Sequence, residues 1–223
     1  MSEKHTIGLI GGTGPEGKGL AVRFALAGHD ILIGSRDAER AASAATAIES
    51  IIDGRTGAGA ITGRANSAAA RAADTIVLAV PYAGQTATLE ELGTEIDGKI
   101  VVNVISPLKF EHGRATATPP PAGSAAEEAA ALAPAARWVA GFHTLPAGEL
   151  ADPESDMNTD VLVCSDDADA KKTVMELASG IAGARPVDAG GLESARYLEA
   201  ATVLLININK IYRAHGSLKI VGI

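Results

Sequence analysis

The stretch that decides the fold stands close to the start of the chain and reads Thr6-Ile7-Gly8-Leu9-Ile10-Gly11-Gly12-Thr13-Gly14-Pro15-Glu16-Gly17. Its first five residues are a short apolar run that predicts a strand, and residues 18–28 after it predict a helix. The six residues from Gly12 fit G-x-G-x-x-G, the pattern that binds a dinucleotide when it joins a strand to a helix. A plain strand–helix turn is the alternative, and the position after the first strand favours the dinucleotide site.

The pattern assigns a physical task to each residue of this loop. Gly12 permits the tight turn, Gly14 lets backbone amides approach a pyrophosphate, and Gly17 lets the helix lie close to the strand. Pro15 suits the first helical turn, because its missing N–H would be unpaired there in any case. The start of the helix then offers oriented N–H groups to the anion.

The end of the second predicted strand, residues 30–34, favours NADP(H) over NAD(H). An NAD site usually places Asp or Glu about twenty residues after the loop, where it holds the ribose 2′-hydroxyl. This chain has Ser35-Arg36 there and Arg40 one helical turn later. A hydroxyl and two guanidinium groups bind a 2′-phosphate through charge-assisted hydrogen bonds, whereas an exposed arginine at a strand end is the alternative. Asp37 lies past the usual position, and we expect it to cap the second helix.

Strand-like and helix-like segments alternate along the rest of the chain, which is typical of βαβ units and a doubly wound, mainly parallel α/β sheet. We expect further strands at residues 75–80, 100–103, 138–141, 161–164 and 185–188. Residues 116–123 contain three prolines and predict an extended surface connection. A last helix, residues 192–215, is apolar nearly all round, so we expect it to pack against the sheet or a second subunit.

Composition and charge exclude several classes of protein. The 223 residues are 47% hydrophobic and 21% charged, which is typical of a globular chain. A net charge of −8 argues against a nucleic-acid partner or an anionic membrane surface, because both need a broad basic face. Cys164 is the lone cysteine, so no internal disulfide and no cysteine-rich metal site is expected. No apolar run approaches the roughly 20 residues that span a bilayer, and we expect a cytoplasmic protein without a signal peptide.

Segments spread over nearly the whole chain resemble the NADPH:F420 oxidoreductases, also called F420-dependent NADP reductases. The likeness begins in the glycine loop and at residues 28–36. It continues in Lys99-Ile100-Val101-Val102, Ser106-Pro107-Leu108, His143-Thr144-Leu145-Pro146-Ala147, Val163-Cys164-Ser165-Asp166-Asp167 and Arg185-Pro186-Val187-Asp188-Ala189-Gly190. The resemblance implies an NADP-binding Rossmann domain, residues 1–148, and a smaller, largely helical C-terminal region, residues 149–223, that closes the F420 and nicotinamide site and contributes to dimerisation. It also implies a homodimer and reversible hydride transfer between NADP(H) and coenzyme F420, a deazaflavin.

The glycine pattern and the resemblance together indicate a set of cofactor-binding residues. These are Gly12, Thr13, Gly14, Pro15, Glu16, Gly17, Ser35, Arg36, Arg40, Val80, Pro81, Tyr82, Leu108, Ala147 and Leu218. By resemblance, Thr13 to Glu16 would hold the pyrophosphate, and Ala147 and Leu218 match positions near the nicotinamide. Tyr82 stands where the family often has tryptophan and would line the dinucleotide.

Hydride transfer between two stacked rings needs no side chain to move a proton at the reacting carbons, so we expect positioning to dominate catalysis. His143 is an acid–base candidate, although a structural role is favoured. His112, Lys109 and Arg114 form a small basic group that either meets the anionic tail of F420 or lies in a solvated loop. No metal site is expected. Two alternatives stay open: an NADPH-dependent reductase of a flavin, metal complex or imine, and a non-catalytic NADP(H) sensor.

Overall fold

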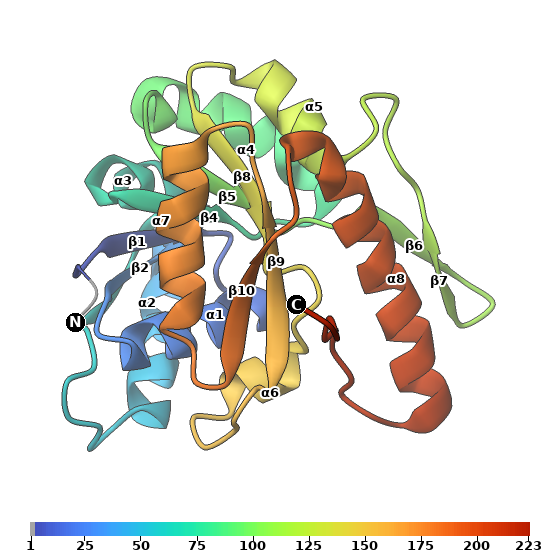
Figure 1. Ribbon diagram of the computed structural model, residues 1–223. Coiled ribbons are helices and arrows are strands. Elements are labelled where there is room, and N and C mark those ends of the chain that lie inside the picture. Colours follow the sequence, from blue (N-terminus) through green and yellow to red (C-terminus); the bar gives the residue numbers. More distant parts are fainter. Residues whose placement is uncertain (1–2) are drawn as a thin grey trace.

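The computed structural model describes residues 3–223, in which helices cover both faces of one eight-stranded sheet (Figure 1). The strands of this sheet are β1 (Thr6–Ile10), β2 (Asp30–Ser35), β3 (Ile61–Ala65), β4 (Thr75–Leu78), β5 (Ile100–Asn103), β8 (Arg137–Gly141), β9 (Thr159–Cys164) and β10 (Ala184–Asp188). Their order across the sheet is β10-β9-β8-β5-β4-β1-β2-β3. The strands from β8 to β3 are all parallel and follow the order of a Rossmann fold, which confirms the predicted doubly wound sheet.

Two strands from the C-terminal region extend this sheet at one edge. Strands β9 and β10 are parallel to each other, but β9 is antiparallel to β8, with Ala140 opposite Cys164. Cys164 is fully buried and free, and burial raises the pKa of its thiol to about 12. It therefore behaves as a small apolar side chain of the core.

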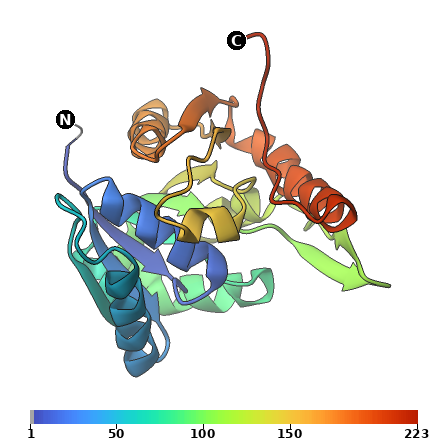
Figure 2. The ribbon, with the colours of Figure 1, turned by 90° about the horizontal axis from the view of Figure 1, so that it is seen from below.

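Two hydrophobic cores lie on opposite faces of the sheet, because successive side chains of each strand alternate between them. The helices are α1 (Pro15–Leu26), α2 (Ala38–Ile51), α3 (Asn66–Ala72), α4 (Gln85–Leu92), α5 (Ala125–Leu132), α6 (Ala147–Ala151), α7 (Ala168–Ser179) and α8 (Ala195–Tyr212). Leu9 joins α1, α2 and α7 in one core, whereas its neighbour Ile10 joins α3, α4 and α5 in the other. Figure 2 shows α1 and α2 grouped together, with α8 at the opposite side of the molecule.

Strand β3 and helix α3 are present in the structure but absent from the sequence prediction. The outward positions of β3 carry polar residues, and Gly63 stands at its centre. A Cβ on Gly63 would lie 2.2 Å from the backbone carbon of Ala41 in α2. The glycine that obscures this strand in the sequence is therefore the residue that lets α2 lie directly on it.

A β-hairpin projects beside α8 where the sequence predicted no strands. Strands β6 (Leu108–Glu111) and β7 (Arg114–Ala117) pair antiparallel, and His112 and Gly113 turn the chain with φ of 49° and 75°. Asn207 of α8 accepts from the Ala115 N–H at 2.9 Å and donates to its carbonyl at 2.8 Å. The predicted connection at residues 116–123 is therefore wrong at its start, because Thr116 and Ala117 belong to β7.

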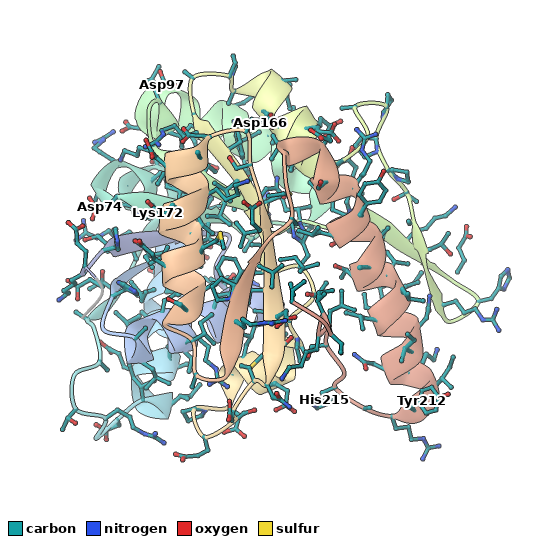
Figure 3. All side chains as sticks on the ribbon, viewed as in Figure 1. Asp74, Asp97, Asp166, Lys172, Tyr212 and His215 are labelled. Atoms are coloured by element: carbon teal, nitrogen blue, oxygen red, sulfur yellow. The ribbon has the colours of Figure 1, made fainter. Side chains whose placement is uncertain are left out.

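The last helix is shorter than predicted and has two different sides. A 3-10 turn (Leu192–Ser194) precedes α8, and the left-handed Arg213 ends it with φ of 52°. Figure 3 shows Tyr212 and His215 at that end. Leu198 and Leu205 are buried, while the opposite side exposes large apolar residues, so α8 packs on the molecule with one side alone. No helix within residues 3–223 is long and apolar enough to cross a membrane.

Candidate dinucleotide site

The glycine loop turns the chain sharply from β1 into α1. Gly11 has a φ of 72°, which glycine adopts without the clash a side chain would cause. The Gly12 N–H donates to the carbonyls of Leu9 at 3.0 Å and Gly34 at 3.2 Å, which holds the loop against β2. A Cβ on Gly17 would lie 2.6 Å from the Gly12 Cα, so α1 passes the loop at a distance that requires glycine.

Helix α1 begins with N–H groups that have no hydrogen-bond partner within residues 3–223. Gly14 is the N-cap and contributes no side chain, and Pro15 has no N–H. Among the described residues, no acceptor meets the N–H of Glu16 or Gly17. A Cβ on Gly14 would meet no atom within 4 Å, so the space in front of these groups is open. This helix start has the geometry of an anion-binding site.

A cavity of about 750 Å³ opens beside the loop. Its walls follow the carboxyl ends of β1, β2, β4 and β5, which is where open α/β sheets bind ligands. The predicted cofactor residues that line it are Thr13, Gly14, Pro15, Glu16, Gly17, Ser35, Arg36, Arg40, Val80, Pro81 and Tyr82. The structure thus brings together the three segments that the sequence singled out separately.

The β2 end of the cavity is basic and preorganised. Asp37 caps α2, as predicted, because its Oδ1 accepts from the N–H groups of Glu39 at 2.9 Å and Arg40 at 3.2 Å. The Ser35 hydroxyl accepts from the Asp37 N–H at 3.2 Å. Arg36 and Arg40 are exposed, and neither has an ion-pair partner in residues 3–223. Both guanidinium groups are therefore available to an anionic ligand.

A chain of hydrogen bonds joins the two walls that follow β4 and β5. The Tyr82 hydroxyl donates to Glu128 Oε1 at 3.1 Å, and Gln85 Nε2 donates to Glu128 Oε2 at 3.1 Å. Asn103 Nδ2 donates to Gln85 Oε1 at 3.0 Å, and Asn103 Oδ1 accepts from the Ile105 N–H at 2.9 Å. Burial and the Glu128 carboxylate raise the pKa of Tyr82, so its hydroxyl stays protonated. These bonds fix the cavity walls against α5.

Two polar side chains in the cavity wall have buried oxygens without a hydrogen-bond partner among the described residues. They are Glu16 Oε1 and Ser106 Oγ. Burial raises the pKa of Glu16 to about 8, so its carboxyl group is mostly neutral at pH 7. Buried polar atoms usually have partners, and in a ligand-binding cavity the ligand is a natural source of them.

His143 lies outside the set of residues that line the cavity. Its side chain is buried, and burial lowers its pKa to about 4. Its carbonyl accepts from the Thr202 hydroxyl of α8 at 2.8 Å. At pH 7 His143 therefore lacks the acidic imidazolium proton that a general acid would donate. The hydrogen bond from Thr202 joins the segment after β8 to α8.

The remaining predicted cofactor residues do not line the cavity. Gly12 is buried behind the loop, Leu108 begins the hairpin, and Ala147 begins α6. The Leu218 carbonyl accepts from the Asp160 N–H at 2.9 Å, which ties the C-terminal tail to the start of β9. Their contacts with a cofactor stay predictions.

The basic group predicted around the hairpin is largely exposed. Lys109 pairs with Glu111 at 2.8 Å within β6, and His112 stands at the turn. Arg114 is exposed at the start of β7. This exposure is compatible with contact to the anionic tail of F420 and with a solvated turn, so the role of the group stays a prediction.

Sequence reasoning missed several residues of the cavity wall. Asn66, Thr88, Val104 and Ile105 all line it. Asn66 is buried, and its Oδ1 accepts from the Gly11 N–H at 3.4 Å, so it supports the glycine loop from below. An Asn directly after a strand would have indicated a residue at the ligand-binding edge of the sheet, but the sequence did not predict that strand, β3.

A Rossmann sheet, a glycine loop with free helix N–H groups and a basic second-strand end define a class: dinucleotide-binding proteins whose site suits NADP(H). No group of three His, Cys, Asp or Glu side chains within residues 3–223 is placed to hold a metal ion.

Comparison with known proteins identifies the family. Residues 6–107 match the family model described as "NADP oxidoreductase coenzyme F420-dependent". The chain is 38% identical over 213 residues to the F420-dependent NADP reductase of Methanocaldococcus jannaschii, covering 95% of each chain. It is 40% identical to the enzyme of the same name from Methanothermobacter thermautotrophicus, covering 91% of this chain and 88% of that one. The chain belongs to the F420-dependent NADP reductase family.

A solved structure agrees with this assignment over the whole fold. The protein from Arthrobacter sp. FB24, described as a candidate F420-dependent NADP reductase, superimposes with a TM-score of 0.82 at 26% sequence identity. The match covers 99% of this chain and 100% of that one, so it includes β9, β10 and α8 as well as the dinucleotide-binding part.

Proposed function

We propose that this protein is an NADPH:F420 oxidoreductase that transfers a hydride reversibly between NADP(H) and coenzyme F420. The observation that carries the proposal is the 38–40% identity to proteins named F420-dependent NADP reductase over at least 88% of their length. The cavity supports it, because its free helix N–H groups and exposed arginines suit the two anionic ends of NADP(H).

The residues of the cavity fit a dinucleotide on structural grounds. The open space in front of Gly14 admits a pyrophosphate, and the unpaired Glu16 and Ser106 oxygens offer hydrogen bonds to a ligand. Ser35, Arg36 and Arg40 would hold the 2′-phosphate. NADPH, when bound, supplies the hydride, and the deazaflavin ring of F420 supplies the carbon that accepts it.

The protein positions the two rings against each other and surrounds the reacting carbons with uncharged side chains. Val80 and Pro81 give the wall after β4 small, apolar side chains, which leave room for a flat ring. His143 is neutral at pH 7 and lies outside the cavity wall. We propose that no side-chain acid or base is essential, and that residues near 148 separate a dinucleotide-binding part from a C-terminal part that completes the F420 site.

Anaerobic mixing of the purified protein with NADPH and oxidised F420 tests this function. We expect the visible absorbance of the deazaflavin to be lost with NADPH, and far more slowly with NADH. Reduction of FMN without reduction of F420 would instead indicate a flavin reductase. Tight NADPH binding with no turnover of either acceptor would indicate a sensor.

We further propose a cytoplasmic homodimer in which the exposed side of α8 meets a second copy of the chain. Apolar residues form a stripe on this side of α8 and recur at alternating spacings of four and three residues, which is the pattern of helices that pack against each other in a coiled coil. The stripe consists of Tyr197, Ala201, Leu204, Ile208 and Ile211. Tyr197, Leu204 and Ile211 are 69%, 59% and 73% exposed, which is unusual for a contiguous apolar surface of a monomer. The free, buried Cys164 fits a reducing compartment.

A charge placed in the stripe tests the dimer. We expect Leu204→Glu to convert the protein to a monomer in light scattering after gel filtration, because an ionised carboxylate cannot be buried between two apolar helices. Leu132→Glu is the matched control, since Leu132 is also exposed but lies on α5 outside the stripe. A wild-type monomer at micromolar concentration, or an unchanged dimer in Leu204→Glu, would contradict this interface.

A further inference from the structure

The carboxyl group of Glu16 is an unexplained feature of the cavity. Its Oε1 is one of five buried side-chain nitrogen or oxygen atoms without a partner in residues 3–223, and Ser106 Oγ is another. Both line the dinucleotide cavity, from α1 and from the loop after β5. A carboxylate removed from water without a partner is costly, whereas a neutral carboxylic acid can donate one hydrogen bond.

The position of Glu16 sets two electrostatic effects against each other. It is the second residue of α1, where the helix dipole favours a negative charge. Burial of the carboxyl group acts in the opposite direction and raises the pKa of Glu16 to about 8.

The charged and titratable groups on the surrounding elements do not neutralise this carboxyl group. They are Lys18 on α1, Arg36, Asp37 and Arg40 after β2, Tyr82 after β4 and Glu149 on α6. Asp37 is engaged in the α2 cap and Glu149 bonds to Ser155 and His215. No salt bridge joins Glu16 to a cation within the described residues.

We propose that Glu16 enters the dinucleotide complex as the neutral acid and donates a hydrogen bond to the bound dinucleotide, so that NADP(H) binding is coupled to the protonation of this side chain. The inference rests on the proposed function, because it requires the cavity to hold NADP(H). It makes Glu16 a cofactor-binding residue whose protonation sets the pH range of NADP(H) binding.

The sign of the coupling follows from the charges. A bound pyrophosphate brings negative charge and excludes water, and both effects disfavour ionised Glu16. The complex therefore holds the proton more tightly than the free protein. Affinity is constant while Glu16 is protonated in both states, below pH about 8, and falls as the pH rises above that value. The limiting slope is about tenfold per pH unit for one coupled proton.

Isothermal titration of the full-length protein with NADP⁺ at pH 7, 8 and 9 and constant ionic strength measures this coupling. We expect the wild-type Kd to rise about tenfold between pH 7 and 9. Glu16→Gln, which keeps the shape and the donor of the neutral acid, should change by less than about twofold over the same range. Glu49→Gln removes a carboxylate from the exposed side of α2 and should retain the wild-type pH dependence.

Other titrating groups do not imitate this result. The NADP⁺ 2′-phosphate is ionised above pH about 6, and the Tyr82 pKa lies above its usual value of 10.0. Burial raises the pKa of Glu199 to about 7, but Glu199 is retained in Glu16→Gln and cannot distinguish the two proteins. A second readout needs no variant: calorimetry at pH 9 in two buffers of different ionisation heat should show uptake of close to one proton on binding to the wild type.

Two results would overturn the proposal. One is a wild-type affinity that stays constant up to pH 9 without proton uptake, and the other is the same pH dependence in Glu16→Gln as in the wild type. If either occurs while NADPH still bleaches F420 at pH 7, the coupling is wrong and the proposed function stands. If NADP⁺ fails to bind at pH 7, the proposed function fails and this inference fails with it.

Discussion

Arg36→Ala should separate the affinities for NADPH and NADH. Arg36 lines the basic end of the cavity, is exposed, and has no ion-pair partner within residues 3–223. Its removal therefore leaves no buried charge behind, so the fold should be unaffected. What is lost is the charge-assisted contact with the 2′-phosphate, worth roughly 1.5–3 kcal/mol. That corresponds to NADPH binding weakened by about tenfold to a hundredfold.

The assay is a fluorescence or calorimetric titration of each variant with NADPH and NADH at the same ionic strength. NADH lacks the 2′-phosphate, so its affinity should hardly change in Arg36→Ala. Lys172→Ala is the matched control, because Lys172 is a largely exposed cation on α7, whose N-terminal part Figure 3 shows beside the edge strands. Equal losses for NADPH and NADH would refute the assignment of Arg36 to the 2′-phosphate, as would an unchanged NADPH affinity. Salt should weaken NADPH binding to the wild type more than to the variant.

Two further changes test the loop and the C-terminal tail. Gly17→Ala places a Cβ 2.6 Å from the Gly12 backbone, so it should lower stability by about 1–3 kcal/mol and weaken NADPH and NADH binding alike; an unchanged melting temperature would contradict that close approach. Asp160→Asn should destabilise the protein at pH 6, because the Arg185 guanidinium holds the pKa of Asp160 at about 2. A carboxyl group with a lowered pKa stabilises the fold above its unfolded value of 3.8 and loses that effect as the pH falls towards 2. The difference in melting temperature between wild type and Asp160→Asn should therefore shrink between pH 4 and pH 2.

The glycine loop and the basic end of the cavity could be predicted from the sequence because both depend on residue type at short spacing. A Cβ on Gly12 or Gly17 would clash with neighbouring backbone, so both positions require glycine, and Asp37 caps α2 as its position indicated. The alternation of strands and helices predicted the doubly wound sheet for the same reason. Local pattern and local function coincide in these segments.

Elements that depend on distant contacts could not be predicted in this way. Gly63 weakens the strand signal of β3, yet it is required by the approach of α2, which no local pattern shows. The hairpin β6–β7 forms a separate two-stranded sheet, and Asn207, about ninety residues away in the sequence, holds it in place. The sequence of α8 has apolar residues on nearly all sides of the helix, so only the folded structure shows which side is buried.

The two halves of the cavity therefore differ in how they select a ligand. Arg36 and Arg40 form the basic end of the cavity, and in an acidic protein of net charge −8 these exposed cations favour an anionic group such as the proposed 2′-phosphate. The wall after β4 presents the apolar side chains of Val80 and Pro81. At the start of α1, the carboxyl group of Glu16 is mostly neutral at pH 7 because burial of this group disfavours the charged form. An ionised Glu16 would repel the pyrophosphate. Burial keeps its carboxyl group neutral, and the neutral acid can donate a hydrogen bond to the dinucleotide instead. This effect of burial exists only in the folded chain, which is why the pH dependence of NADP⁺ binding reports on the site more directly than the motif does.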